Sequence, residues 1–343
     1  MFFRKIFPVF FIVTFLTLAT AVADSAKKEI GKEPTGLQAW LDQKTATGNW
    51  NGCRSQLENK GFTIFSNFTT DIMGNPIGGQ QKRAMYAGFL ELSLAFDFEK
   101  MVSLKGSALT VSNYWASGNN LSTYIGNFFG VQEIYAAGNY FFGELDLSQA
   151  LFNDRLVLEI GRLFAGDVFA QSELWQYYVS GGINSNLASI ASNIFFPVFN
   201  ITAWAARLTW QPNKHWQLVG AVYNANNKVQ EPQEHGLYFN FNFNKGYLGL
   251  GQITYKHHQS REEEGFPGSF VFGGYYQSSK FPYLSNAARF QRGNYGFYLV
   301  ADQMIYRSDW PEFVGPRHLR ASASYAERVK HPYHRQQVVP KDR

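Results

Sequence analysis

The 343-residue chain has little charge and almost no cysteine, and both shortages exclude classes of protein. Only 17% of its residues are charged, against about a quarter in an ordinary soluble domain. Disorder is excluded because it requires low hydrophobicity, whereas 45% of these residues are hydrophobic. Cys53 is the single cysteine, which rules out an intrachain disulfide and a cysteine-based metal cluster.

Beyond the first twenty residues the chain lacks a long uninterrupted apolar run. The longest stretch without charge, residues 174–206, is broken by glycine, proline and asparagine. A lipid-facing helix would leave that polarity unsatisfied, so no transmembrane helix is expected there.

The N-terminus has the three parts of an export signal. Two basic residues precede an apolar run over residues 6–18, and an A-x-A site ends at Ala23. This order predicts a cleaved signal peptide over residues 1–23. The alternative, a membrane anchor helix, is disfavoured because the run is shorter than the roughly 20 residues that a span needs.

The formal net charge of +5 belongs to the two ends of the chain. Residues 1–23 carry two basic residues and no acid, and residues 307–343 carry eight basic and four acidic residues. The body between them is close to neutral. A nucleic-acid partner, which would need a basic surface on the body, is therefore not expected.

Aromatic residues make up 17% of the chain, and many of them recur with period two. Apolar residues alternate with polar or small ones over residues 89–98, 202–210 and 237–244. Strict alternation predicts strands with one apolar and one polar face. About eleven such strands can be read between Phe62 and Tyr306.

Alternation alone fits both a soluble β-sandwich and a membrane barrel, so the turns decide between them. The shortest connections lie at residues 99–100, 153–154, 211–214 and 244–245. Aromatic residues flank three of the four, and the opposite strand ends open into long polar loops such as residues 112–130 and 166–201. Short turns on one side with aromatic borders predict a transmembrane antiparallel β-barrel whose girdle marks the periplasmic rim.

The order of long and short connections leaves one conflict. Residues 257–267 and 277–293 both read as long loops, although one of them should fall on the short-turn side. A strand missed or merged in this region would explain it.

A short helix is expected ahead of the strands. Trp50, Cys53 and Leu57 recur at helical spacing and Gly61 follows, which predicts an amphipathic helix ended by glycine. The predicted organisation is a periplasmic segment over residues 24–61 followed by the barrel over residues 62–307.

Five motifs in order resemble the OprB-like carbohydrate-selective porins. They are Thr47-Gly48-Asn49-Trp50-Asn51-Gly52-Cys53-Arg54 with Leu57 and Gly61, Asn75-Pro76-Ile77-Gly78-Gly79, Glu159-Ile160-Gly161-Arg162-Leu163 with Asp167 and Phe169, Gly273-Gly274-Tyr275-Tyr276, and Gly293-Asn294-Tyr295-Gly296-Phe297-Tyr298 running into Ala301-Asp302-Gln303-Met304-Ile305-Tyr306. The similarity spans about residues 36–307.

The resemblance implies a sixteen-stranded outer-membrane barrel that passes sugars, monosaccharides such as glucose among them, by facilitated diffusion. It implies small sugars, outer-membrane lipid and the barrel-assembly machinery as partners, is compatible with a homo-oligomer, and calls for no cofactor.

The end of the chain departs from the family pattern. Family members continue through several more strands, whereas alternation stops after Arg307 and residues 308–343 form a basic, histidine-rich tail. We therefore expect a truncated or frameshifted relative, and closure of its barrel is in doubt because bare strand edges do not occur in lipid.

Catalytic motifs are missing. No G-x-S-x-G elbow, H-E-x-x-H helix or phosphate-binding glycine loop is present, so an enzyme is not expected. His257 and His258 are interpreted as a solvated pair because adjacent strand residues face opposite ways, and residues 262–264 as a charged loop and not a calcium site. The less favoured alternatives are a transport-incompetent relative, an outer-membrane barrel enzyme and a secreted sugar-binding β-sandwich.

Alternation also predicts which polar side chains line the interior. The residues expected to point inward are Glu91, Asp97, Lys105, Glu133, Glu144, Asp146, Glu159 and Arg207. Three more residues are candidates for a constriction: Arg162 by its position near a strand end, Asp167 in the loop that follows, and Trp175 in the uncharged 174–206 stretch. That stretch either folds inward or stays outside, packed on its neighbours.

Overall fold

The computed structural model describes residues 36–41, 43, 45–135, 140–182, 186–259, 263, 265–283 and 286–305. The predicted signal peptide and the 308–343 tail lie outside these residues. Contacts divide the chain into a smaller unit that contains the N-terminal helices and a larger unit, Ile64–Phe98 with Leu104–Asp309, that contains nearly all of the sheet.

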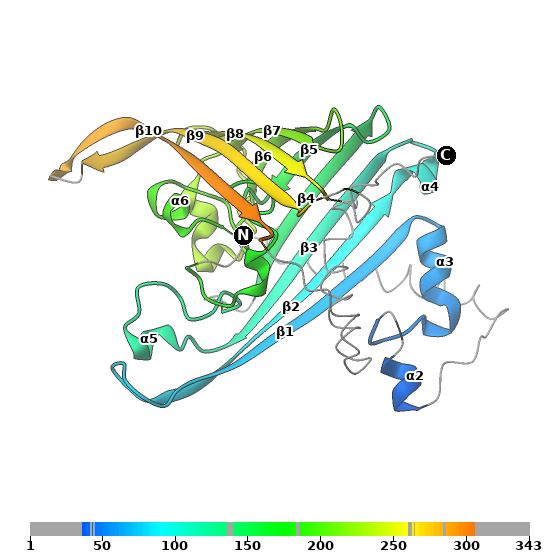
Figure 1. Ribbon diagram of the computed structural model, residues 1–343, viewed down its shortest axis with the longest axis horizontal. Helices are drawn as coiled ribbons and strands as arrows, with labels where there is room; N and C mark the ends of the chain where they lie inside the picture. The colour runs from blue at the N-terminus through cyan, green and yellow to red at the C-terminus, as the bar shows by residue number, and fades with distance from the viewer. Residues whose placement is uncertain are drawn as a thin grey trace, which may run out of the picture. The chain divides into compact units, whose positions relative to one another are not determined.

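Ten strands form one sheet in simple sequence order. They are β1 (Phe62–Asn75), β2 (Arg83–Asp97), β3 (Ser107–Gly118), β4 (Tyr140–Leu151), β5 (Leu156–Leu163), β6 (Ala203–Trp210), β7 (Trp216–Asn224), β8 (Tyr247–His257), β9 (Gly268–Tyr283) and β10 (Asn286–Gln303). Figure 1 shows them side by side from β1 in blue to β10 in orange. Neighbours from β2 to β10 pair antiparallel.

The described residues hold ten strands where alternation indicates about eleven. Residues 237–244 alternate strictly, yet they form no strand. β9 and β10 explain why residues 257–267 and 277–293 could not both be long loops. β8 ends and β9 begins at the short-turn edge, and most of the supposed loop 277–293 is the hairpin of β9 and β10, shown in yellow and orange in Figure 1.

The helices are short. They are α2 (Leu37–Leu41), η2 (Trp50–Gly52), α3 (Cys53–Asn59), α4 (Phe98–Val102), α5 (Ser122–Ile125), η3 (Trp175–Tyr177), α6 (Ala188–Asn193), η4 (Asn227–Gln230) and η5 (Pro232–Glu234). No helix in the described part of the chain combines the length and the apolarity that crossing a bilayer requires.

The smaller unit is built around α3. The Arg54 guanidinium lies over the Trp50 ring, 5.1 Å from its centroid, and its Nε is 3.5 Å from the Glu58 carboxylate one turn on. Lys100 Nζ, from α4, donates to the Glu58 carbonyl at 3.0 Å. Gly61 then ends the helical region with φ of +91°, a conformation that favours glycine.

The two faces of the sheet differ in chemistry, because directly paired residues share a face. One face, called here the outer face, exposes large apolar side chains, for example Ile160, Leu208, Val222, Phe272 and Phe297. The opposite, inner face carries polar residues over β2 to β6. An apolar exposed face backed by a polar one is the pattern of a membrane-barrel wall.

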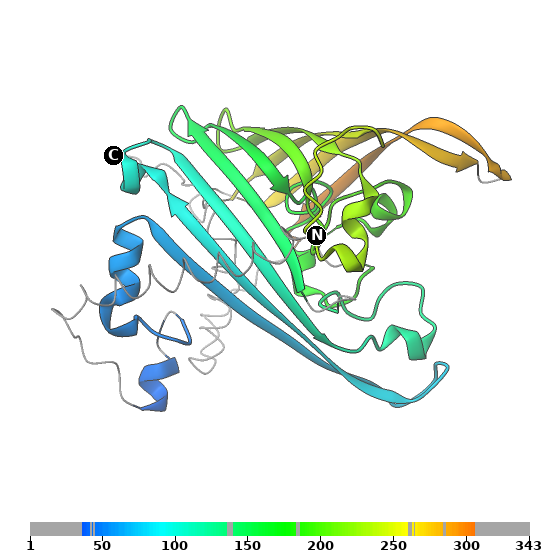
Figure 2. The ribbon, with the colours of Figure 1, turned by 180° about the vertical axis from the view of Figure 1, so that it is seen from behind.

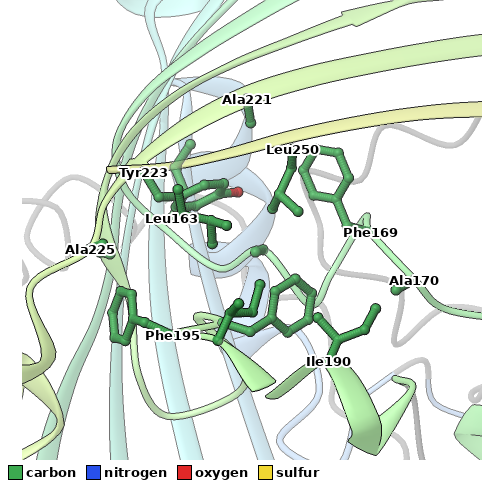
Figure 3. Packing of buried hydrophobic residues seen from close by; sticks show 14 of the residues in the cluster. Leu163, Phe169, Ala170, Ile190, Phe195, Ala221, Tyr223, Ala225 and Leu250 are labelled. Carbon is green, nitrogen blue, oxygen red and sulfur yellow. The ribbon is translucent and has the colours of Figure 1, made fainter. Parts of the chain in front are cut away.

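The largest buried cluster lies on the inner face. The connection between β5 and β6, residues 164–182 and 186–202, is called here the inner segment, and it carries η3 and α6. Its apolar residues pack against inner-face side chains of β7 to β10; those that Figure 3 labels are Phe169, Ala170, Ile190 and Phe195 from the segment, with Ala221, Tyr223 and Leu250 from the strands. Figure 2 shows α6 beside this face of the sheet. Of the two places expected for this stretch, the structure shows the inward one.

Candidate functional site

The inner segment begins at an ion pair on the inner face. Glu159 and Arg207 are direct partners on β5 and β6, and both nitrogen-to-oxygen distances of their bidentate pair are 2.6 Å. Arg207 is 4% exposed, and its Nη1 also donates to the Phe164 carbonyl at 2.9 Å. The Tyr223 hydroxyl donates to the same carbonyl at 3.1 Å. The start of the inner segment is therefore held by β6 and β7 together.

Gln252 on β8 holds the next turn of the inner segment. Its Nε2 donates to the Val168 carbonyl at 3.0 Å, and its Oε1 accepts from the Ala170 amide at 3.0 Å. The Tyr298 hydroxyl, from β10, donates to the same Oε1 at 2.9 Å. One amide side chain thus satisfies two backbone groups of the segment, and a second strand orients it.

The far part of the inner segment is held in the same way by β9 and β10. Gln277 Oε1 accepts from the Phe195 amide at 2.8 Å. Asn294 Nδ2 donates to the Asn193 carbonyl at 3.0 Å. These contacts fix α6 and the residues after it at the strand ends opposite the short turns.

Side-chain pairs complete the attachment. Ser172 Oγ donates to Asp302 on β10 at 2.8 Å, and Lys256 on β8 pairs with Glu173 at 2.9 Å. The inner segment is therefore tied to every strand from β6 to β10 on the inner face.

An acidic, hydroxyl-rich area lies on the inner face of β2 to β4. Ser93 and Ser112 share a hydrogen bond of 2.8 Å, and Ser93 donates to Glu91 at 2.9 Å. Tyr114 is almost completely buried beside them, within electrostatic reach of Glu91, Glu144 and Asp167. This area carries hydrogen-bonding groups and an excess of negative charge.

Two aromatic rings of the inner segment remain accessible. Trp175 packs partly against the buried cluster, whereas the Tyr177 and Tyr178 rings are more than half exposed. A flat, exposed aromatic ring suits the apolar face of a sugar ring.

The structure brings together most of the side chains that alternation assigns to the interior. Glu91, Asp97, Glu144, Asp146, Glu159 and Arg207 lie on the inner-face register, and Asp167 belongs to the inner segment that covers it.

Two predicted interior residues lie elsewhere. Lys105 is exposed in the turn before β3, at the short-turn edge. Glu133 precedes β4 in a loop at the opposite edge, with its carboxylate against Gly181 of the inner segment. In both cases the expectation extended the alternation past the end of a strand, where it no longer fixes the direction of a side chain.

Arg162 also departs from its expected place, because it belongs to the outer face. It is 1% exposed, and its Nη1 and Nη2 donate to the Gly236 and Thr202 carbonyls, each at 3.0 Å. Residues 235–244, called here the outer strap, cover it, with the Phe239 ring 5.3 Å from the guanidinium. Trp204 Nε1, on the same face, donates to the Phe239 carbonyl at 3.3 Å.

Sequence reasoning missed the residues that hold the inner segment. Gln252, Tyr223 and Tyr298 stand in strands whose alternation was legible, whereas Gln277 lies in a stretch that was expected to be a loop. The roles of all four depend on a loop far away in the chain. A polar amide at an inner-face position among leucines, as at Gln252 after Leu248 and Leu250, is the one signal that the sequence offered.

A metal site with three or more protein ligands is absent from the described part of the chain. Among the described residues, no group of three or more histidine, cysteine, aspartate or glutamate side chains is placed to hold a metal ion.

Comparisons with known proteins agree with this geometry. The chain is 25% identical over 285 residues to the putative porin QuiX of Acinetobacter baylyi and 23% identical over 248 residues to porin B of Pseudomonas aeruginosa. The matches cover 77% and 70% of this chain but 62% and 54% of those proteins. The chain therefore spans less than two thirds of their length.

A solved structure shows the same fold. The high-pH structure of Pseudomonas putida OprB superposes with a TM-score of 0.68 at 20% identity, covering 77% of this chain and 66% of that one. The predicted fold class, an all-β antiparallel barrel wall, is confirmed by this likeness.

The model of a protein family described as carbohydrate-selective porins of the OprB family matches residues 81–339. The match includes most of the 308–343 tail, which the sequence pattern sets apart. The match is to a family of porins and not to a family of enzymes, as expected. Because the match covers well over half of the chain, this protein belongs to the OprB family of carbohydrate-selective porins.

Proposed function

We propose that this chain lets small sugars, monosaccharides such as glucose among them, diffuse across the bacterial outer membrane. In this proposal the exposed apolar outer face contacts outer-membrane lipid, and the polar inner face borders water. Export through the predicted signal peptide and insertion by the barrel-assembly machinery belong to the same proposal.

The inner segment is the single observation that carries the proposal. In this proposal the 39-residue connection between β5 and β6, fixed to β6 through β10 on the inner side, narrows the path that a solute takes. Beside the ion pair of Glu159 and Arg207 on the same face, the acidic area of β2 to β4 offers carboxylates and hydroxyls.

This arrangement suits neutral polyols. Carboxylate and amide side chains exchange hydrogen bonds with sugar hydroxyls, and the exposed Tyr177 and Tyr178 rings stack on the apolar sugar face. Each contact is weak by itself, which lets the solute leave as readily as it enters.

Liposome swelling with the refolded full-length protein tests the proposal. We expect rapid swelling in glucose, slower swelling in an oligosaccharide of four or more units, and slower swelling in an organic acid than in a neutral sugar of similar size. Absence of any sugar uptake from vesicles that contain heat-modifiable, folded protein would refute the function.

A single substitution tests the role of the inner segment. Gln252→Leu removes the bonds to Val168 and Ala170, so the segment loosens and the oligosaccharide enters faster relative to glucose. Gln303→Leu is the matched control, because Gln303 is exposed and bonds to the β8–β9 connection instead. Equal size discrimination in the wild type and in Gln252→Leu would show that the segment does not set the width.

A further inference from the structure

Two imidazole rings meet at the short-turn edge of the sheet, away from the inner face. His257 ends β8 and His258 follows it, and their Nδ1 atoms are 3.0 Å apart. The rings are almost perpendicular, at 85°, with centroids 4.9 Å apart. Both side chains are half-buried.

The backbone explains why neighbours in sequence converge. Successive residues of a strand point to opposite faces, which is why the sequence indicated two separate side chains. His258, however, has left the strand with φ of +49°, in the left-handed region. This conformation returns its ring to the side of His257.

The two rings are also held in place. His257 stacks on Phe270 of β9, with planes 17° apart and centroids 5.8 Å apart, and on Tyr255, with planes 25° apart. Glycines surround the pair: a Cβ at Gly265 would lie 2.8 Å from His258 Nδ1, and a Cβ at Gly268 would lie 2.3 Å from His257 Nε2. Only glycine leaves these spaces open beside the rings.

In the metal-free pair the two nitrogens share an N–H···N hydrogen bond of 3.0 Å, and this separation suits one coordination angle better than another. With metal–nitrogen bonds of about 2.1 Å, two ligands at 90° stand about 3.0 Å apart, and two at the tetrahedral angle about 3.4 Å. The observed 3.0 Å fits the right angle of a tetragonal or octahedral ion. Copper(II) and nickel(II) have that preference with nitrogen ligands, whereas zinc favours a tetrahedron.

We propose that His257 and His258 chelate a divalent transition-metal ion, Cu²⁺ or Ni²⁺, through their two Nδ1 atoms, with water at the remaining positions. Both rings bind in the neutral form with the proton on Nε2, so the ring that carries its proton on Nδ1 in the metal-free pair loses it to solvent there and takes one up at Nε2, with no net change in charge. The site is separate from the sugar path and does not depend on the proposed function.

Cu²⁺ binding to the full-length protein in detergent tests the site. His318, His331 and His334 are first replaced by alanine, so that the histidines of the tail do not contribute. We expect one Cu²⁺ per chain by calorimetry and an electron paramagnetic resonance spectrum with coupling to two nitrogens. Ni²⁺ is expected to bind more tightly than Zn²⁺, because the fixed 90° angle disfavours the tetrahedral ion.

Two variants remove one ligand each. His258→Ala deletes a nitrogen, and His257→Phe does so while keeping the ring stack on Phe270. Each is expected to weaken Cu²⁺ binding about tenfold or more and to abolish the two-nitrogen coupling.

His215→Ala is the matched control, since His215 lies on the neighbouring turn and its Nδ1 contacts the Lys256 carbonyl. It should leave both Cu²⁺ affinity and the spectrum unchanged. Heat-modifiable gel mobility verifies that each variant is folded. The proposal is overturned if the tail-substituted protein binds no Cu²⁺, if folded His258→Ala and His257→Phe bind as that protein does, or if His215→Ala abolishes binding.

Discussion

The inner segment and the outer strap leave the same edge of the sheet and end on opposite faces. Both lie in connections between strands on the side opposite the short turns, and both are rich in phenylalanine. In the inner segment Phe169, Phe195 and Phe196 are buried, whereas in the outer strap Phe241 is 64% exposed. Aromatic content alone therefore does not decide which face a loop covers.

The donors and acceptors of the strands account for the difference. The inner segment offers amides and carbonyls to Gln252 and Gln277 on the inner face. The outer strap offers carbonyls to Arg162 and Trp204 on the outer face. Each loop follows the face on which its backbone groups find partners, because leaving them unpaired away from water costs more than exposing some rings.

The largest loss of stability is expected from removing Arg207, which bonds both to Glu159 and to the start of the inner segment. Arg207→Ala leaves the Glu159 carboxylate without its bidentate partner and takes one donor from the Phe164 carbonyl. Breaking a buried ion pair from one side costs about 3–5 kcal/mol, so we expect a loss of unfolding free energy of this order. Urea unfolding in lipid vesicles, followed by gel mobility, measures it.

Glu159→Gln measures how much of this loss of unfolding free energy comes from the charge of the pair. The amide keeps an acceptor for Arg207 but lacks the charge, so the loss should be smaller than in Arg207→Ala. A loss under about 1 kcal/mol in Arg207→Ala would mean that the pair behaves like an exposed one.

Arg162→Ala should release the outer strap and leave the inner segment in place, because the segment loses a bond only at its last residue, Thr202, and keeps its contacts with β6 to β10. The change removes the donors to Gly236 and Thr202, and unmade buried hydrogen bonds cost about 1–3 kcal/mol. Limited proteolysis is expected to cut within residues 235–244, with glucose swelling rates unchanged. Arg162→Lys should restore part of the protection, because an ammonium cannot reproduce the planar fork. Cleavage of the inner segment in Arg162→Ala would contradict the independence of the two loops.

Period two predicted extended backbone reliably and strand pairing less well. Residues 89–98 and 202–210 contribute to β2 and β6, but residues 237–244, with an equally strict pattern, form the outer strap. The Phe239 and Phe241 rings of the strap contact Trp204 on β6, so an alternating apolar pattern also occurs where a loop packs on a sheet without joining its ladder.

For the candidate site, too, residues within strands were predicted better than residues beyond the strand ends. Side chains within strands, such as Glu159 and Arg207, were placed on the correct face by parity alone. Lys105 and Glu133, beyond the strand ends, were not. The roles of Gln252 and Asp302 depend on contacts with the inner segment across 82 and 130 residues of chain, respectively. Short-range patterns cannot report contacts at such separations.

The smallest effect is expected at Glu133, whose carboxylate lies against Gly181 of the inner segment. Its side chain keeps part of its surface in solvent, yet its carboxyl lies against Gly181, and this partial burial raises its pKa above the usual 4.5. The folded loop therefore takes up a proton more readily than the unfolded chain, so the contact strengthens as the pH falls through this range and weakens as the pH rises. Exchange of the Gly181 amide, which donates to the Gly130 carbonyl at 2.9 Å, measures the contact after correction for intrinsic exchange. Glu133→Gln should remove the pH dependence while keeping the protection, and a wild-type protection that increases with pH would contradict the assigned direction.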